Sequence, residues 1–177
     1  SKITTAKDVE GKTVAVITLA SMSANAVRDW LKVNGADQTK VRLVELPFSA
    51  MVPGLQRGTI DVALITEPYM SLLKDQVRPI AIPHDVIGKQ FYLSSFFAKR
   101  DWINGNKPLA HAFMQAMYEA AQWANTHHNE SAAILAKYSK LQLDEVRNMT
   151  RVMFATSFDP ALLQPVLDLG SRHGELK

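Results

Sequence analysis

The chain has 177 residues, of which 47% are hydrophobic and 21% charged, and its formal net charge is +3. This composition is typical of a globular protein with enough apolar material for a core, and it excludes a disordered chain. No apolar stretch is long enough to span a membrane, and the evenly spread charges exclude a basic block for nucleic acid or membrane. The absence of cysteine excludes disulfides, thiolate metal sites and cysteine nucleophiles.

The first half of the chain alternates strand and helix patterns. Runs rich in β-branched and aliphatic residues predict three strands, at 13–18, 41–46 and 61–66. Each run is followed by a helical pattern, at 23–34, 50–57 and 69–75. Helices of this length between strands predict right-handed β-α-β units on a parallel sheet. A further strand is predicted at 77–82, before Pro83.

The second half of the chain has a different pattern, which is mostly helical. A polar connection at His84–Lys89 predicts a domain boundary, with one domain at 1–88 and another at 89–177. The segment Phe91–Ala98 predicts one aromatic-rich strand. The rest predicts four helices, at 109–125, 131–138, 144–154 and 160–169.

Candidate binding residues follow the first predicted strand. In an open α/β sheet, ligands bind beyond the carboxyl ends of the strands, at the N-termini of helices. Ser21, Met22 and Ser23 would supply two hydroxyls, free backbone N–H groups and the positive end of a helix dipole. The alternative is that Ser23 only caps its helix.

Two more candidate places follow the second and third predicted strands. Ser49 comes after the second strand, where it is either a ligand contact or a plain helix cap. Thr66, Glu67 and Tyr69 come after the third strand, where a carboxylate and a phenol could hold a ligand's amine or ring. The alternative there is a surface salt bridge and a packed tyrosine.

Catalytic and metal-binding patterns are not found. His127 and His128 are adjacent and diverge on a helix, and His111 lies far upstream, so the histidines lack metal-ligand spacing. No Gly-x-Ser-x-Gly elbow and no glycine-rich nucleotide motif occurs. We therefore expect no catalytic residue, no metal and no cofactor.

Several short motifs together resemble one protein family. Residues 7–15 (KDVEGKTVA) resemble the opening of a strand in substrate-binding proteins of the nitrate/sulfonate/taurine transporter type. Residues 55–63 (LQRGTIDVA) and Glu67-Pro68-Tyr69 are similar to a signature of that family and to the Glu-Pro that closes it. Residues 98–102 and 106–108 resemble its passage into a long C-terminal helix, so the resemblance covers nearly the whole chain.

The resemblance implies a type 2 periplasmic binding fold, in which a ligand cleft lies between two α/β lobes. Residues 1–88 would be the parallel-sheet second lobe, and residues 89–177 would complete the first lobe with a strand and helices. The N-terminal part of the first lobe has no counterpart, so we expect a truncated chain whose apolar helix stripes form a homodimer through residues 91–177.

The implied function is that of a non-enzymatic binding protein. It would capture a small polar or anionic organic solute in the bacterial periplasm and deliver it to the permease of an ABC transporter. No nucleic-acid partner is expected. Export would require a signal peptide, and none is visible at Ser1-Lys2-Ile3.

Two alternatives remain open. The family also includes proteins similar to pyrimidine-precursor synthases of thiamine biosynthesis, which resemble enzymes using an active-site histidine and iron; the unclustered histidines count against this. The effector-sensing domains of some transcription regulators share the fold, although no helix-turn-helix pattern is present.

Overall fold

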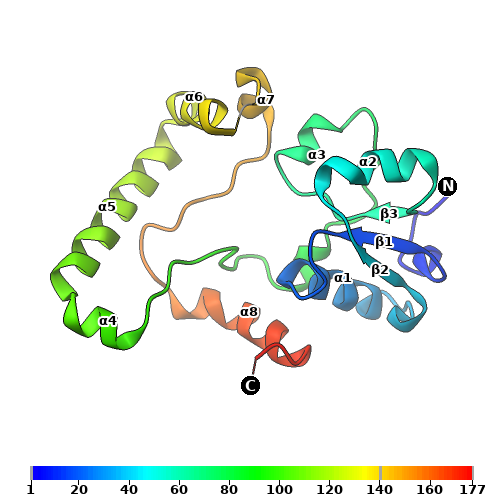
Figure 1. The fold of residues 1–177 in the computed structure, drawn as a ribbon, viewed down its shortest axis with the longest axis horizontal. Coiled ribbons are helices and arrows are strands. Elements are labelled where there is room, and N and C mark those ends of the chain that lie inside the picture. The colour runs from blue at the N-terminus through cyan, green and yellow to red at the C-terminus, as the bar shows by residue number, and fades with distance from the viewer. Residues whose placement is uncertain (1, 140, 177) are drawn as a thin grey trace. The chain divides into compact units, whose positions relative to one another are not determined.

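The computed structural model describes residues 2–139 and 141–176 (Figure 1). Contacts between residues divide the chain into two compact units. Unit 1 runs from the N-terminus to Tyr92 and resumes at Ala161, whereas unit 2 is Leu93–Pro160. The assignment of residues 1–88 and 89–177 to two lobes stays a prediction.

A parallel sheet forms the centre of unit 1. Its strands are β1 (Thr13–Val16), β2 (Arg42–Glu45) and β3 (Val62–Ala63). The strand order is β2-β1-β3 and both pairings are parallel, with Val16 opposite Glu45 and Ala15 opposite Ala63. The predicted α/β class and the three predicted parallel strands are therefore confirmed, although each strand is shorter than its apolar run.

Helices cover both faces of this sheet. The helices of unit 1 are α1 (Met22–Val33), α2 (Phe48–Arg57), α3 (Tyr69–Leu72) and nearly all of α8 (Pro160–Arg172). Short 3-10 turns are η1 (Lys7–Val9), η2 (Gln38–Lys40) and η3 (Pro83–Val86). Gly58 ends α2 in the left-handed conformation, with φ 70°, which a residue without Cβ adopts freely.

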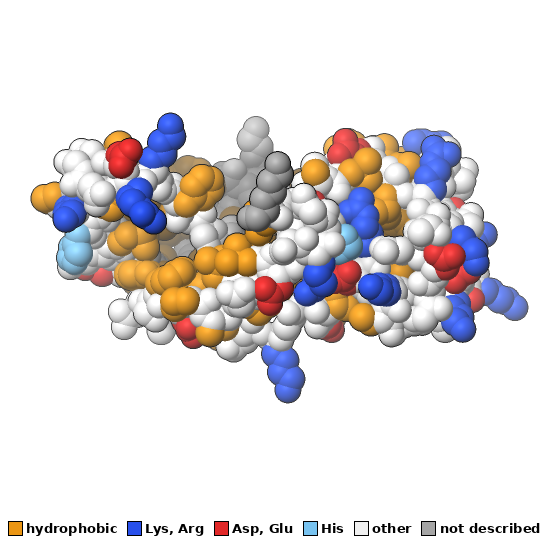
Figure 2. All heavy atoms as spheres, turned by 90° about the horizontal axis from the view of Figure 1, so that it is seen from below, with side chains coloured by type: hydrophobic (Ala, Val, Ile, Leu, Met, Phe, Trp, Pro, Cys, Tyr) orange, Lys and Arg blue, Asp and Glu red, His pale blue; other side chains and the backbone are white. Residues whose placement is uncertain are grey.

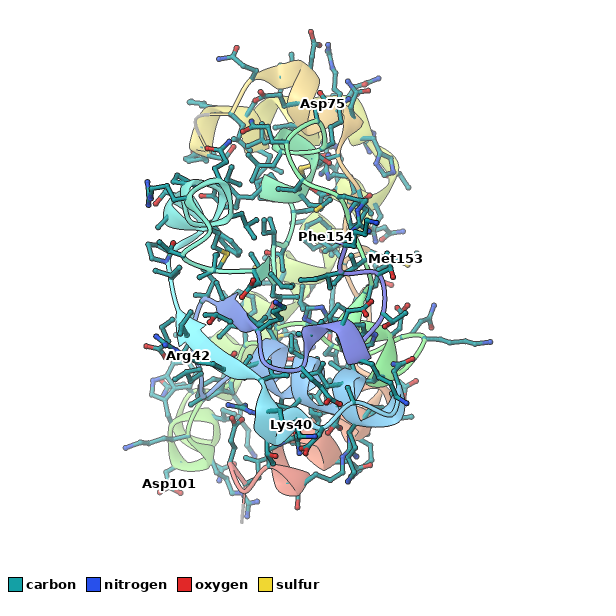
Figure 3. The ribbon with its side chains drawn as sticks, turned by 90° about the vertical axis from the view of Figure 1, so that its right-hand side faces the viewer. Lys40, Arg42, Asp75, Asp101, Met153 and Phe154 are labelled. Carbon is teal, nitrogen blue, oxygen red and sulfur yellow. The ribbon has the colours of Figure 1, made fainter. Side chains whose placement is uncertain are left out.

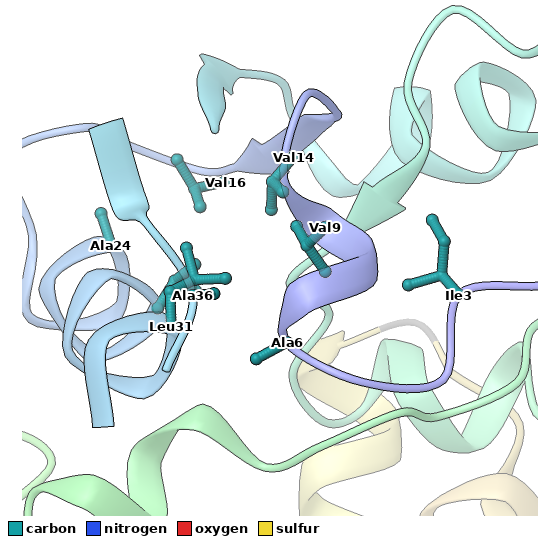
Figure 4. Packing of buried hydrophobic residues seen from close by; sticks show 9 residues of the cluster. Ile3, Ala6, Val9, Val14, Val16, Ala24, Leu31 and Ala36 are labelled. Atoms are coloured by element: carbon teal, nitrogen blue, oxygen red, sulfur yellow. The ribbon is translucent and has the colours of Figure 1, made fainter. Parts of the chain in front are cut away.

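The core of unit 1 has two main clusters. On one face of the sheet, Val14 and Val16 pack against Ala24 and Leu31 of α1, and the turn at η1 closes the cluster (Figure 4). On the other face, Ala15, Met51 and Ile60 form the second cluster, with Met51 supplied by α2. Because β1 is central, its residues are buried on both faces, as its unbroken apolar run predicts.

The C-terminal helix α8 is tied to α1. Leu169 packs with Ala26 and Ile87 in a third apolar cluster. At the end of α8, Arg172 and His173 both bond the carboxylate of Asp29, at 3.0 and 2.9 Å. Burial opposes ionisation of Asp29, but these two hydrogen bonds outweigh it, so the pKa of Asp29 is held below its usual value.

Unit 2 is helical throughout its regular structure. Its helices are α4 (Arg100–Gly105), α5 (Lys107–Thr126), α6 (His128–Ser139) and α7 (Leu143–Asn148). The helical second half is confirmed, and α4 is an addition that the sequence patterns did not predict. None of the helices in the described part of the chain is long and apolar enough to cross a membrane.

Three predicted elements are wrong. The segments 77–82 and 91–98 form no strand: Val77 N–H donates to Leu73 in a turn, and Tyr92 N–H donates to Leu162 at the start of α8. The helix predicted at 144–154 ends at Asn148. Beyond it, the Asn125 side chain donates to the carbonyl of Phe154 at 2.8 Å and accepts from its N–H at 3.0 Å, which replaces helical bonding there.

Many apolar side chains of unit 2 are exposed to solvent. The twenty-residue helix α5 has no buried residue, and its Leu109 and Phe113 are 57% and 45% exposed. Phe97 is 97% exposed, and Phe96 meets Phe113 edge to face with ring centroids 5.3 Å apart. Figure 2 shows hydrophobic side chains gathered on the left half of the face in view. An unburied apolar stripe of this kind favours association with another surface.

Candidate functional site

A hollow lies where β1 and β2 end. Its volume is about 510 Å³, and it is lined by Ile17, Glu45, Leu46, Pro47, Phe48, Ser49 and Tyr69. These residues come from the end of β2, the segments after β1 and β2, and the first residues of α2 and α3. At the other end of β2, Arg42 is the first residue of the strand and Lys40 ends η2 just before it (Figure 3).

Two aromatic rings form one wall of the hollow. Phe48 and Tyr69 stack with their ring centroids 4.7 Å apart and their planes 28° apart. Each is the first residue of its helix and follows a proline, Pro47 or Pro68. Proline lacks an N–H and fixes φ, so it ends the extended segment and places the next side chain at a helix start.

Glu45 holds the loop that follows β1. Its Oε1 accepts the backbone N–H of Leu19 at 2.7 Å. From the other side, Arg28 Nη1 donates to the carbonyl of Leu19 at 3.2 Å and to Asn25 Oδ1 at 2.6 Å. The backbone of Leu19 is therefore held by a carboxylate at its N–H and by a guanidinium at its carbonyl, which orders the approach to α1.

Ser21, rather than Ser23, caps α1. Its Oγ accepts from Ala24 N–H at 3.2 Å and donates to the carbonyl of Thr18 at 2.7 Å. The hydroxyl of Ser23 instead lies 3.0 Å from Nε2 of His84, and burial lowers the pKa of that histidine against the opposing charge of Asp85. Ser23 therefore does not cap α1, which was its alternative role, because Ser21 supplies the cap.

A row of free donors lies at the start of α1. The backbone N–H groups of residues 20–23 have no acceptor among the residues that the structure describes. They stand at the positive end of a twelve-residue helix, which favours negative charge. The side chain of Met22 packs beside the apolar cluster of Ala26, Ile87 and Leu169, so its backbone N–H is the group left at the helix start.

The acidic group after β3 points into its own helix. Glu67 Oε2 accepts from the N–H of Ser71 at 3.0 Å, and Oε1 accepts from its hydroxyl at 2.8 Å. The carbonyl of Thr66 accepts from Met70 N–H at 3.1 Å. These contacts begin α3 and so hold Tyr69 in place.

Of the seven predicted site residues, Ser49 and Tyr69 line the hollow. The others lie in the neighbouring helix starts and strand ends: Ser21, Met22, Ser23, Thr66 and Glu67. Sequence reasoning gave no separate binding role to Phe48 or to Glu45. Each had a usable signal, since Phe48 directly follows the proline that ends a strand and Glu45 is the last charged residue of that strand.

The site can bind a small molecule through apolar contact, stacking and hydrogen bonds. Across residues 2–139 and 141–176, no group of three or more His, Cys, Asp or Glu side chains is placed to hold a metal ion.

Comparison with known proteins shows which proteins this chain resembles. A family model described as the NMT1-like family matches residues 1–139. Two curated relatives, both named nitrate/nitrite binding protein NrtA, come from Nostoc sp. and Synechococcus elongatus. Each is 28% identical to this chain, over 59% and 68% of its length. The matches cover 24% and 29% of the relatives, so the chain spans only about a quarter of their length.

Solved structures share the fold along the whole chain. One is the periplasmic aliphatic sulphonate binding protein SsuA from Escherichia coli, with a TM-score of 0.76 and 24% identity. Another is the alkanesulfonate-binding protein SsuA from Xanthomonas axonopodis pv. citri bound to MOPS, with a TM-score of 0.78 and 19% identity. The matches cover 99% and 100% of this chain but 58% and 63% of theirs.

Proposed function

This chain belongs to the NMT1-like family, and we propose that it is part of a solute-binding protein of an ABC transporter. The protein would capture a small polar or anionic organic solute and deliver it to the permease. The observation that carries this proposal is the hollow at the ends of β1 and β2, next to four backbone N–H groups that have no acceptor among the described residues. The relatives named as binding proteins for nitrate or sulfonates support it.

The proposed binding mode divides the solute between two kinds of contact. An anionic group would accept hydrogen bonds from the N–H groups of Ser21, Met22 and Ser23, where the helix dipole favours negative charge. Ser49 and Tyr69 would contact the body of the solute. Thr66 and Glu67 would act from the start of α3, where Glu67 holds the turn that carries Tyr69.

We also propose how this chain fits into a larger protein and where that protein acts. Residues 1–88 would form one lobe of a two-lobed protein, and closure of the lobes would enclose the solute. The protein would act in the periplasm, as the name of one structural relative says of that relative. It would bind without a reaction of its own and without a nucleic-acid partner.

Self-association of this chain is a separate part of the proposal. Exposed apolar side chains such as Phe96, Phe97 and Leu109 lie between residues 91 and 177, and two copies could cover them mutually. Sedimentation equilibrium should then show a concentration-dependent dimer that weakens in Phe97→Ser. A monomer at all concentrations would contradict it.

The experiment that tests solute binding is a ligand screen by thermal shift, followed by calorimetry on every hit. The panel would contain small anions, amines and pyrimidines. A ligand at 100 times its dissociation constant stabilises the folded state by about 2.7 kcal/mol, which raises Tm measurably. Tyr69→Ala should weaken binding of a hit at least about tenfold, whereas Tyr138→Ala, at a side chain 78% exposed in unit 2, should leave it unchanged. Equal effects of the two variants would contradict the site.

A further inference from the structure

The lining of the hollow carries a negatively charged carboxylate, and the guanidinium of Arg28 bonds Leu19 and Asn25 rather than this carboxylate. Glu45 is the only charged residue among those that line the hollow. In the described part of the chain Glu45 forms no ion pair. Its Oε1 accepts the N–H of Leu19, whereas Oε2 accepts no hydrogen bond from the described residues. One carboxylate oxygen is therefore available to a ligand.

The rest of the lining is apolar and aromatic. Phe48 and Tyr69 stack beside the carboxylate, and Tyr69 is 39% exposed, so part of its ring remains open to a ligand. An aromatic face attracts a cation through its quadrupole, and the attraction grows when the site loses water. Ile17, Leu46 and Pro47 add apolar surface that suits a carbon skeleton rather than a bare ion.

We propose that this hollow receives the protonated amine of an organic solute, with Glu45 as its counter-ion and Phe48 and Tyr69 against its carbon body. The inference rests on the proposed solute-binding function and names the chemical class of the solute. An anionic group on the same solute would find the N–H groups at the start of α1 close by, because Glu45 already bonds Leu19 next to them. Glu45 then determines specificity, since it attracts an ammonium group and repels a simple inorganic anion.

The test uses matched ligand pairs that differ in one amino group. The probes are 3-aminopropanesulfonate against propanesulfonate, 2-phenylethylamine against 2-phenylethanol, and nitrate, each titrated calorimetrically into the natural full-length protein at low salt. The amine member of at least one pair should bind about tenfold or more tightly than its partner, and nitrate should bind most weakly.

Glu45→Gln isolates the charge. Glutamine has nearly the same size and its Oε1 still accepts the N–H of Leu19, so the loop after β1 keeps its position. The variant should reduce the preference for the amine to about twofold or less. Glu175→Gln, which removes an exposed carboxylate of unit 1 outside the hollow, should leave the preference at its original value.

The outcomes separate this inference from the function on which it rests. Binding of propanesulfonate or nitrate with no preference for an amine, or an amine preference that survives in Glu45→Gln, would overturn the inference and leave the solute-binding function standing. No binding of any probe would overturn the inference, and a failed thermal-shift screen as well would overturn the function.

Discussion

Units 1 and 2 contain similar helices but bury them very differently. All three apolar clusters of the described residues lie in unit 1, where α1 alone places Ala24, Val27 and Leu31 in contact with the sheet. In unit 2, α5 has 20 residues against 12 in α1 and buries none of them. An amphipathic pattern therefore predicts a helix, but it does not show that the helix has a surface to cover.

The difference shows which unit is stabilised by its own packing. A sheet with a helix on each face can remove the apolar side chains of all three layers from water, as unit 1 does. Among the described residues of unit 2 there is no strand for the helices to cover, and only Ser131, Ala132 and Val146 are buried. Unit 2 should therefore depend more on a partner surface, and matched substitutions in the two units can test this.

A matched pair of leucine substitutions gives the largest expected effect. Leu31 is 1% exposed and Leu109 is 57% exposed. Leu31→Ala should lower the free energy of unfolding by about 2–5 kcal/mol, because it leaves a cavity between α1 and the sheet. Leu109→Ala should change it by no more than about 0.5 kcal/mol. Urea unfolding at low protein concentration measures both changes. Equal losses of unfolding free energy would contradict the claim that unit 1 buries its helices and unit 2 does not.

Loss of the α1 cap should have a smaller effect. Ser21→Ala removes the acceptor of Ala24 N–H and should cost about 1 kcal/mol of stability. Ser49→Ala is the control, because α2 begins without a side-chain cap, and it should cost less than about 0.5 kcal/mol. The start of α5 likewise has no side-chain cap, so unit 2 offers no equivalent site in that helix. A neutral Ser21→Ala would show that the helix start is held by other contacts.

His84 should make the stability of unit 1 depend on pH, with a still smaller effect. Its pKa in the folded state lies below the ordinary 6.5 because of burial. Between the two values the unfolded chain binds more protons, so this contribution to stability is complete above 6.5 and is lost as the pH falls towards the folded-state pKa. His84→Gln can keep the hydrogen bond to Ser23 without titrating. Lowering the pH from 8 to 5 should lower the urea midpoint of the wild type more than that of His84→Gln. An equal change in the two midpoints would contradict a buried, neutral histidine.

The fold of unit 1 could be predicted from local patterns where a strand is buried on both faces of the sheet. The run at 13–18 is apolar without alternation, which is typical of a central parallel strand, and β1 occupies that place. The runs at 77–82 and 91–98 look similar, but a strand also needs a neighbour with which to pair. Their hydrogen bonds go to Leu73 and Leu162 instead, and no local pattern shows this choice.

The candidate site could be predicted only in outline. The rule that ligands meet the carboxyl ends of parallel strands pointed to the edge of the sheet where the hollow lies, and Ser49 and Tyr69 line that hollow. The stacking of Phe48 on Tyr69 joins residues from two different helices, so sequence spacing does not reveal it. The direction of a carboxylate is equally hidden: Glu67 turns back to Ser71, whereas Glu45 lines the hollow.

The central claim is that the solute binds at the ends of β1 and β2 in unit 1. The most direct test is a titration of the isotope-labelled protein with the tightest ligand from the screen, followed through its backbone amide resonances. The account predicts that the largest shifts fall at residues 19–23, 45–49 and 69. Large shifts confined to 107–148, with these amides unmoved, would contradict it.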